Sequence, residues 1–245
     1  MQRAIITYNW AHISYGEAFE KVIIPRLEFL SKKLEAELVI SNSKNPIFKE
    51  YEGIEDYNII NQYNKSYALK NLVGKFERSL CIDPSIIVSK KIPNFFEMFS
   101  LDNFYAILDG NNGDENCFHR FQEIANIQSI LGSAAWSYGY YDTSLMLLKK
   151  DHSKIFQDHN DKICFNVREE TKINYLLRKN EFSHQKISRQ FNSNALNVID
   201  SKNTIENRNI FPPEILSNNA YAVNVAHFPD EIKNDYIFKL DSIMS

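Results

Sequence analysis

Hydrophobic residues along this chain follow two alternating spacings, which predict strands and helices in turn. Residues 4–8 and 37–41 are short apolar runs of the kind that form strands. Between these runs, apolar side chains recur every three or four residues and line one face of a predicted helix: Phe19, Ile23, Leu27, Leu30 and Leu34. Because Pro25 lies inside this pattern and removes a helical hydrogen bond, we expect a kink or a restart there. A strand, a helix and a strand in this order predict parallel pairing through a right-handed crossover.

The same alternation continues to the end of the chain. It predicts helices at 66–76, 93–99, 119–131, 168–179 and 229–244, and strands that end at residue 82 or span 103–108, 144–148 and 221–226. No internal repeat or long linker interrupts it. The pattern predicts one α/β domain over residues 1–245, with a mixed, mostly parallel, Rossmann-like sheet flanked by helices. Residues 201–220, rich in Asn and Pro, are expected to form an ordered but irregular surface segment.

Composition and charge exclude several classes of protein. The 245 residues are 44% hydrophobic and 24% charged, as is ordinary for a soluble globular chain. A formal net charge of -3 gives no electrostatic footprint for nucleic acid, and we expect no nucleic-acid partner. Three widely spaced cysteines fit reduced thiols rather than a disulfide framework or a zinc site. No apolar run approaches the roughly 18 residues that span a membrane, and the first residues do not resemble a signal peptide, so we expect a cytoplasmic protein.

One segment carries candidate chemistry. Residues 79–88 read as a buried strand, then Asp83-Pro84-Ser85, then a second apolar run. In open α/β sheets, ligands bind at the C-terminal ends of strands, which is where Asp83 would lie. Asp-Pro-Ser is also good turn chemistry, in which the carboxylate bonds only to its own backbone. The segment alone leaves a ligand site and a simple turn open.

Five segments occur in an order that resembles the nucleotide-sugar-dependent glycosyltransferases of the A-type (GT-A) fold, especially the family of glycogenin and bacterial galactosyltransferases. The segments are 65–69, 80–88, 140–148, 169–174 and 226–233. The resemblance covers about residues 4–240. It implies a single GT-A-like domain that transfers a sugar from a nucleotide-sugar donor, for which a UDP-sugar is expected, to a glycan or other acceptor.

The resemblance also implies roles for individual residues. Members of this family bind a divalent cation, Mn²⁺ or Mg²⁺, through an aspartate-x-aspartate motif, and the cation offsets the charge of the diphosphate leaving group. Asp83 would contact this metal or the nucleotide ribose, and His227 the metal or the diphosphate. Lys65 and Lys233 would contact the diphosphate. The catalytic candidates are Asp142 and Glu169, which would face the acceptor and the reacting sugar.

The chain departs from the family pattern at four positions. The second aspartate of the metal motif is Ser85, an asparagine is Asp142, a glycine is Ser144, and an Asp-Gln pair is Glu169-Glu170. With Ser85 in the motif, metal binding would be weaker or absent, and lysine would supply part of the positive charge. These departures leave open an alternative function. In it, a catalytically impaired GT-A-fold protein acts as a nucleotide-binding, glycan-binding or interaction module.

Each candidate also has a structural interpretation that the sequence leaves open. Asp142 is also suited to capping a strand, the two glutamates to favouring a helix N-terminus through its dipole, and His227 to a buried structural position. An aromatic group could stack on a sugar ring or belong to the core: Trp136, Tyr138, Tyr140 and Tyr141. The acidic segment 109–116 lacks the final glutamate of an EF-hand and is predicted to be a solvated turn.

Overall fold

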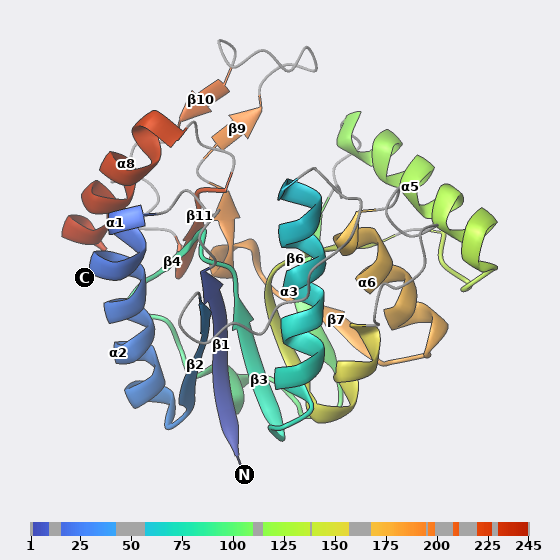
Figure 1. Cartoon of the computed structure of the whole chain (residues 1–245), viewed down its shortest axis with the longest axis horizontal. Helices are drawn as coiled ribbons and strands as arrows, with labels where there is room; N and C mark the ends of the chain where they lie inside the picture. Colours follow the sequence, from blue (N-terminus) through green and yellow to red (C-terminus); the bar gives the residue numbers. More distant parts are fainter. Residues whose placement is uncertain are drawn as a thin grey trace.

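The computed structural model describes residues 2–9, 16–42, 57–109, 115–137, 139–156, 168–194, 196–198, 208–210, 220–226 and 230–244. The order of elements is largely the predicted alternation (Figure 1). The strands are β1 (Arg3–Asn9), β2 (Glu37–Asn42), β3 (Arg78–Ile82), β4 (Ile86–Val88), β5 (Phe104–Asp109), β6 (Tyr140–Lys149), β7 (His184–Lys186), β8 (Ser193–Asn194), β9 (Leu196–Val198), β10 (Arg208–Ile210) and β11 (Ala222–Asn224). The helices are α1 (Gly16–Ala18), the π-helical η1 (Phe19–Ile23), α2 (Ile24–Leu34), α3 (Tyr57–Val73), α4 (Phe95–Met98), α5 (Glu115–Leu131), α6 (Glu169–Lys179) and α8 (Asp230–Ile243), with 3₁₀ turns η2 (Lys150–Ile155) and η4 (Arg189–Phe191).

Six strands form the main sheet, in the order β2-β1-β3-β6-β5-β7. β1 is parallel to both β2 and β3, and β5 is parallel to β7, whereas β6 is antiparallel to both of its neighbours. The sheet is therefore mixed and mostly parallel, as predicted, and the expected parallel pairing of the first two strands is confirmed. All five residues of β3 are buried, as is usual for a strand covered on both faces.

Helices cover both faces of this sheet, and each face has its own hydrophobic core. Side chains alternate along β1, so that Ile5 joins one core while Ala4 and Ile6 join the other. The first core includes residues of η1, α2 and α8, and the second includes residues of α3, α5 and α6. Figure 1 shows the same division, with α1, α2 and α8 on one side of the strands and α3, α5 and α6 on the other. The molecule has three layers with the sheet in the middle.

A smaller sheet lies beside the end of β3. β11 is antiparallel to β4 and parallel to β8, in the order β4-β11-β8. The amide of Val225 continues this pairing by donating to the carbonyl oxygen of Ser85 at 3.0 Å. The small sheet therefore holds the segment that follows Asp83 against the C-terminal part of the chain.

The differences from the predicted boundaries have clear causes. At Pro25 the helix changes type without a break, because the π-helical η1 ends at Ile23, α2 begins at Ile24, and both residues have right-handed helical backbone angles. α3 begins well before residue 66, since its first turns are polar and give no apolar period. β6 begins at Tyr140 rather than at residue 144, because polar residues interrupt its apolar run. Of the predicted turn at 109–116 and the segment 201–220, residues 110–114, 201–207 and 211–219 lie outside the described residues.

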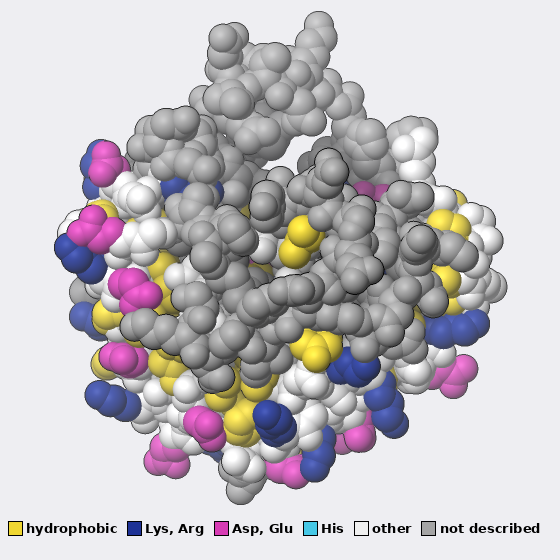
Figure 2. All heavy atoms as spheres, viewed as in Figure 1, with side chains coloured by type: hydrophobic (Ala, Val, Ile, Leu, Met, Phe, Trp, Pro, Cys, Tyr) yellow, Lys and Arg dark blue, Asp and Glu magenta, His cyan; other side chains and the backbone are white. Residues whose placement is uncertain are grey.

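The described surface mixes charges of both signs. On the face seen in Figure 2, Lys and Arg side chains alternate with Asp and Glu side chains around the described part of the molecule. This distribution agrees with the low net charge of the sequence. In the described ranges, no helix has both the length and the apolar character that crossing a membrane requires.

Candidate active site

A buried lysine, Lys65, is the centre of the candidate site. It belongs to α3, and its side chain is 6% exposed. Its ammonium lies 3.0 Å from Oδ1 and 3.1 Å from Oδ2 of Asp83, and 3.8 Å from Oε1 of Glu169. Asp83 directly follows β3, and Glu169 is the first residue of α6. One cation therefore joins two carboxylates that come from distant parts of the sequence.

β6 completes the surroundings of Lys65 through Thr143. The ammonium donates to the carbonyl oxygen of Thr143 at 3.0 Å and is 3.2 Å from its hydroxyl. An ammonium has three N–H donors, and Asp83 and Thr143 together offer four acceptor oxygens within hydrogen-bond distance. The protein itself thus satisfies Lys65 and holds its side chain in one position.

The contacts set the charge of this cluster. Burial lowers the pKa of Lys65, but the carboxylates of Asp83 and Glu169 outweigh it and raise the pKa above its ordinary value, so Lys65 stays protonated. For Glu169, burial is the largest effect and raises the pKa to about 7, opposed by Lys65 and reinforced by Asp83 and Asp142. Burial also raises the pKa of Asp83, against Lys65 and a hydrogen bond from Tyr8. Glu169 is therefore a carboxyl group that titrates near neutral pH.

Asp83 combines both interpretations that its sequence context allowed. Its carbonyl oxygen accepts from the amide of Ile86 at 3.0 Å, which closes a turn over Pro84 and Ser85. Its side chain takes no part in that turn and is bound by Lys65 instead. Because β3 lies between β1 and β6, the carboxylate stands at the C-terminal end of a central strand. Ligands of open α/β sheets bind at such a position.

Asp142 lies inside β6 and belongs to a hydrogen-bond network between the two sheets. Its carboxylate accepts from the amide of Ser144 at 2.7 Å, from the Ser144 hydroxyl, and from Nδ2 of Asn192 at 3.3 Å. The Ser144 hydroxyl in turn accepts from Asn192 at 2.7 Å and from Asn224 at 3.1 Å. With one donated and two accepted bonds, this hydroxyl is fully used. Ser144, where the family pattern has glycine, therefore fixes the orientation of Asp142.

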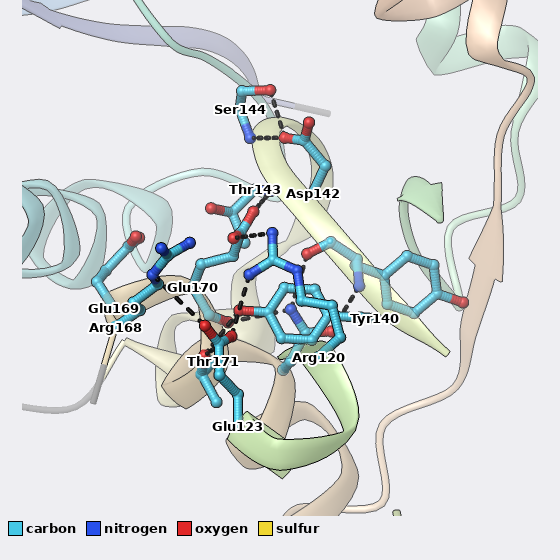
Figure 3. Close-up of polar contacts among 12 residues, drawn as sticks. Arg120, Glu123, Tyr140, Asp142, Thr143, Ser144, Arg168, Glu169, Glu170 and Thr171 are labelled. Carbon is cyan, nitrogen blue, oxygen red and sulfur yellow. Dashed lines mark hydrogen bonds and ion pairs between the residues drawn. The ribbon is translucent and has the colours of Figure 1, made fainter. Parts of the chain in front are cut away.

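Glu170 turns away from Lys65 and connects three elements. Figure 3 shows its carboxylate directed toward the backbone of Thr143 and the guanidinium of Arg120. It accepts from the Thr143 amide at 3.2 Å and lies 3.2 Å from the Arg120 guanidinium. Arg120 also pairs with Glu123 at 3.0 Å and lies 4.0 Å from the ring centroid of Tyr140. Glu170 thus fixes the strand residue that holds Lys65, and connects it to α5.

The structure brings four of the predicted site residues together: Lys65, Asp83, Asp142 and Glu169. Lys233 lies in α8, which packs against α1, η1 and β4, and its side chain is buried. His227 lies outside the described residues. The roles predicted for Lys233 and His227 therefore stay predictions.

The aromatic group is part of the core instead of an open stacking surface. The side chains of Trp136, Tyr140 and Tyr141 are each less than 5% exposed and pack in the core on the α3, α5 and α6 side. Tyr138 lies outside the described residues. Of the two interpretations that the sequence left open, the structure favours the core for the three described rings.

Sequence reasoning missed three residues of the site: Arg120, Thr143 and Asn192. Each acts through a contact with a residue far along the chain, such as the 78 positions between Lys65 and Thr143. Arg120 and Thr143 stand within ordinary helix and strand patterns. The one available signal was the polar interruption of β6 at Asp142-Thr143-Ser144, because buried polar residues in a central strand require partners.

The described residues offer few metal ligands. Ser85 is buried, and a hydroxyl is a weaker ligand for a hard cation than the carboxylate of the family motif. In the ranges that the structure describes, no group of three or more His, Cys, Asp or Glu side chains could hold a metal ion. Asp83 alone, however, can share a cation with phosphate oxygens and water, which is how proteins often bind Mg²⁺. The described donors fit a cation held mainly by a bound diphosphate.

Comparison with known proteins identifies the fold of this chain. No protein-family model matches the sequence, and no curated protein matches it. Solved structures do match over nearly the whole chain. A glycosyltransferase involved in the glycosylation of the major capsid of PBCV-1 is 9% identical with a TM-score of 0.59, and the match covers 98% of this chain and 100% of that one. The galactosyltransferase LgtC, solved in complex with donor and acceptor sugar analogs, is 13% identical with a TM-score of 0.54, over 97% of this chain and 96% of that one.

A third structure is the bifunctional glycosyltransferase WbbM in its apo form, which is 8% identical with a TM-score of 0.59. That match covers 99% of this chain and 50% of WbbM. The mixed, mostly parallel six-stranded sheet with helices on both faces was predicted from the sequence pattern, and it matches the GT-A fold that the family resemblance implied. At these levels of identity the likeness establishes the fold, while the activity has to be argued from the residues.

Proposed function

We propose that this chain is a glycosyltransferase that moves a sugar from a nucleotide-sugar donor, a UDP-sugar, to a glycan or other acceptor. The observation that carries the proposal is the buried cluster of Lys65, Asp83 and Glu169 at the C-terminal end of β3. Removing two carboxylates and one lysine from water costs more free energy than burying apolar side chains of the same size, and such buried ionisable groups with shifted pKa values are concentrated at functional sites. In a GT-A fold, this cluster lies at the strand end where donors bind.

In the proposed reaction, Asp83 contacts the donor nucleotide or its cation. Lys65 keeps the Asp83 carboxylate in place and adds positive charge near the diphosphate. Four protein oxygens already surround the Lys65 ammonium. We therefore expect Lys65 to stabilise the diphosphate through its electrostatic field and not through a direct hydrogen bond. Lys233 and His227, which the family pattern assigns to the diphosphate, would supply the direct contacts.

Glu169 and Asp142 are the proposed catalytic groups. Transfer forms a bond between an acceptor oxygen and the anomeric carbon, breaks the bond from that carbon to the diphosphate, and requires a base for the acceptor proton. Oε1 of Glu169 is buried and has no hydrogen-bond partner among the described residues, so it can accept a hydrogen bond from an acceptor hydroxyl. A pKa of about 7 suits a base at neutral pH. Asp142, oriented by Ser144, would bind a sugar hydroxyl.

A cation, if bound, would be held by Asp83 together with His227, and would neutralise charge on the diphosphate. This arrangement makes a prediction for Ser85. Wild-type protein should bind Mn²⁺ weakly, and only when UDP supplies oxygens. Ser85→Asp should raise the affinity for Mn²⁺ about tenfold with UDP present, since each charged ligand contributes on the order of 1–3 kcal/mol.

Without UDP, the new carboxylate of Ser85→Asp repels Asp83 and lowers stability. Isothermal titration of Mn²⁺ at saturating UDP measures the effect, and Ser85→Asn is the matched control because it has the size of Asp without the charge. If Ser85→Asp and wild type bind Mn²⁺ equally, Ser85 does not face the diphosphate.

The pKa of Glu169 gives a prediction with two independent readouts. If ionised Glu169 accepts the acceptor proton, transfer should rise with pH through about 7, and Glu169→Gln should lose that inflection together with about 100-fold in rate. The folded-state pKa of about 7 lies above the ordinary 4.5, so the folded protein holds more protons between these values and its stability falls as pH rises from 4.5 to 7. Glu169→Gln should remove this loss, which amounts to about 3 kcal/mol.

Urea denaturation at pH 5 and pH 8 tests the stability part, and a pH–rate profile tests the catalytic part. Glu77→Gln, at an exposed position, is the control. A Glu169→Gln variant that keeps the rate and pH profile of the wild type would show that Glu169 is only structural.

Binding of donors gives the simplest test of the proposed function. A ligand that binds only the folded state raises the melting temperature. We expect UDP and at least one UDP-sugar to raise it, with a larger shift when Mn²⁺ is added. A shift with slow release of the sugar supports the transferase. A shift without release or transfer would instead support an impaired nucleotide-binding module, and no shift with any nucleotide would contradict the transferase and favour a glycan-binding or interaction module.

A further inference from the structure

A pocket of about 380 Å³ lies away from the Lys65 cluster, at the edge of the main sheet. The C-terminal end of α6, the start of β6, the end of β5 and the whole of β7 form its walls. Its lining includes Leu108, Tyr141, Arg178, His184, Gln185 and Lys186. Arg178 and Glu169 are nine residues apart in α6, which corresponds to roughly 14 Å along the helix. The pocket is thus separated from the Lys65 cluster along α6.

The lining of this pocket is basic. Among the described residues, it contains the guanidinium of Arg178, the ammonium of Lys186 and the imidazole of His184, and no carboxylate. Among the described residues, no ion pair joins any of these three side chains to an acid. His184 and Lys186 are two positions apart in β7, so their side chains point to the same side of that strand. The positive charges of Arg178 and Lys186 therefore both belong to the lining of the pocket.

Arg178 is the fixed element of this lining. Its guanidinium donates to the carbonyl oxygen and Oδ1 of Asn174 at 3.2 and 3.0 Å and to the carbonyl oxygen of Gly139 at 2.6 Å. It also lies 4.9 Å from the ring centroid of Tyr141 and 5.2 Å from that of Trp136. All of these partners are neutral. Of its five N–H donors, three hydrogen bonds account for at most three, so donors remain for a ligand.

The charge of Arg178 is partly buried and has no anionic partner among the described residues. Buried charges in proteins are ordinarily paired, so this one marks a place for an anion. Burial, and then the positive charge of Arg178, lower the pKa of His184. The imidazole is held 2.9 Å from the Tyr141 hydroxyl through Nδ1, which leaves its other nitrogen for the pocket.

We propose that this pocket binds the oxyanion group of an acidic sugar, a carboxylate or a phosphate carried on a monosaccharide unit. Guanidinium donors match the geometry of both oxyanions, and Lys186 adds a flexible second cation. The pocket is within the size range of small-ligand sites, and Leu108 offers it an apolar surface. That the ligand is a sugar rests on the proposed glycosyl transfer, in which the pocket would hold an acidic unit of the acceptor.

Two-dimensional NMR titration of the whole chain at low ionic strength tests this proposal without any transferase activity. The probes are glucuronate, glucose 6-phosphate, inorganic phosphate and uncharged glucose. We expect at least one of the two acidic sugars to bind, with shifts confined to residues of α6 and β7 around the pocket, and glucose to cause none. Glucuronate alone would identify a carboxylate, and glucose 6-phosphate alone a phosphate.

The matched variants are Lys186→Gln, which removes a cation from the lining, and Lys179→Gln, which removes an exposed cation of α6 outside it. We expect Lys186→Gln to weaken binding of the acidic sugar about fivefold and Lys179→Gln to leave it unchanged. Equal binding by both variants, or no binding of either acidic sugar, would overturn the proposal. If inorganic phosphate binds as tightly as both acidic sugars, the assignment to a sugar is overturned. A folded Arg178→Gln variant should bind none of the anionic probes.

Discussion

Replacing Lys65 with methionine should have the largest effect of any substitution in this molecule. The change keeps most of the side-chain length and removes the ammonium that contacts both Asp83 and Glu169. Breaking a buried ion pair by removing one partner destabilises proteins by roughly 3–5 kcal/mol, because the remaining charge is buried without compensation. We therefore expect a large loss of stability together with a loss of at least 100-fold in sugar transfer.

The pH dependence of that loss identifies its cause. Without Lys65, the pKa values of Asp83 and Glu169 should rise further above their unfolded values, so the folded protein holds extra protons and loses stability as pH increases. Lys65→Met should accordingly be more destabilised at pH 8 than at pH 5.5 in urea denaturation. Lys70→Met, at an exposed position of the same helix, is the control. A Lys65→Met variant as stable as wild type at pH 8 would mean that the two carboxylates do not depend on Lys65.

Asp83→Asn is expected to separate the structural role of Asp83 from its proposed ligand-binding role. Asparagine keeps the shape and the backbone turn to Ile86 but loses the negative charge. Hydrogen bonds to charged groups contribute about 1.5–3 kcal/mol, so we expect affinity for UDP and the UDP-sugar to fall about 10- to 100-fold in a folded variant. Circular dichroism checks the fold, and isothermal titration measures the affinity.

Asp102→Asn, which removes an exposed carboxylate, is the matched control for this experiment. It should bind the donor as the wild type does. If Asp83→Asn is folded and also keeps the wild-type affinity, Asp83 serves only the turn and the ion pair with Lys65.

The fold was predictable from sequence because its main strands are nearly continuous apolar runs. β3 is buried along its whole length, and its apolar run in the sequence predicted a strand that ends directly before Asp83. In the small sheet, β11 lies within the strand predicted at 221–226, whereas β4 and β8 have only three and two residues and too few positions to show a period. The first turns of α3, which carry Lys65, were also hidden, because they are polar and show no apolar period.

The carboxylates of the candidate site were predictable from the sequence, but the residues that hydrogen-bond or pair with the site residues were not. Asp83 and Glu169 stand at element ends, where the resemblance to a known family assigns roles. The partners that orient them come from elsewhere in the chain: Thr143 holds Lys65, and Arg120 holds Glu170 across 50 positions. Such contacts depend on how helices and strands pack together, which no local pattern of one sequence records. The substitution of glycine by Ser144 was visible in the sequence, but its three hydrogen bonds were not.

We infer that this GT-A fold uses the Lys65 cluster to transfer a sugar. The most direct measurement is release of nucleoside diphosphate from a panel of UDP-, GDP- and other nucleotide sugars, each with and without Mn²⁺, by wild type, Asp83→Asn and Glu169→Gln. The account predicts that wild type consumes at least one UDP-sugar, slowly by hydrolysis when no acceptor is present, and that both variants release at least tenfold less diphosphate while remaining folded. Folded wild-type protein that consumes none of these donors with any acceptor glycan offered, or variants that consume a donor at the wild-type rate, would contradict it.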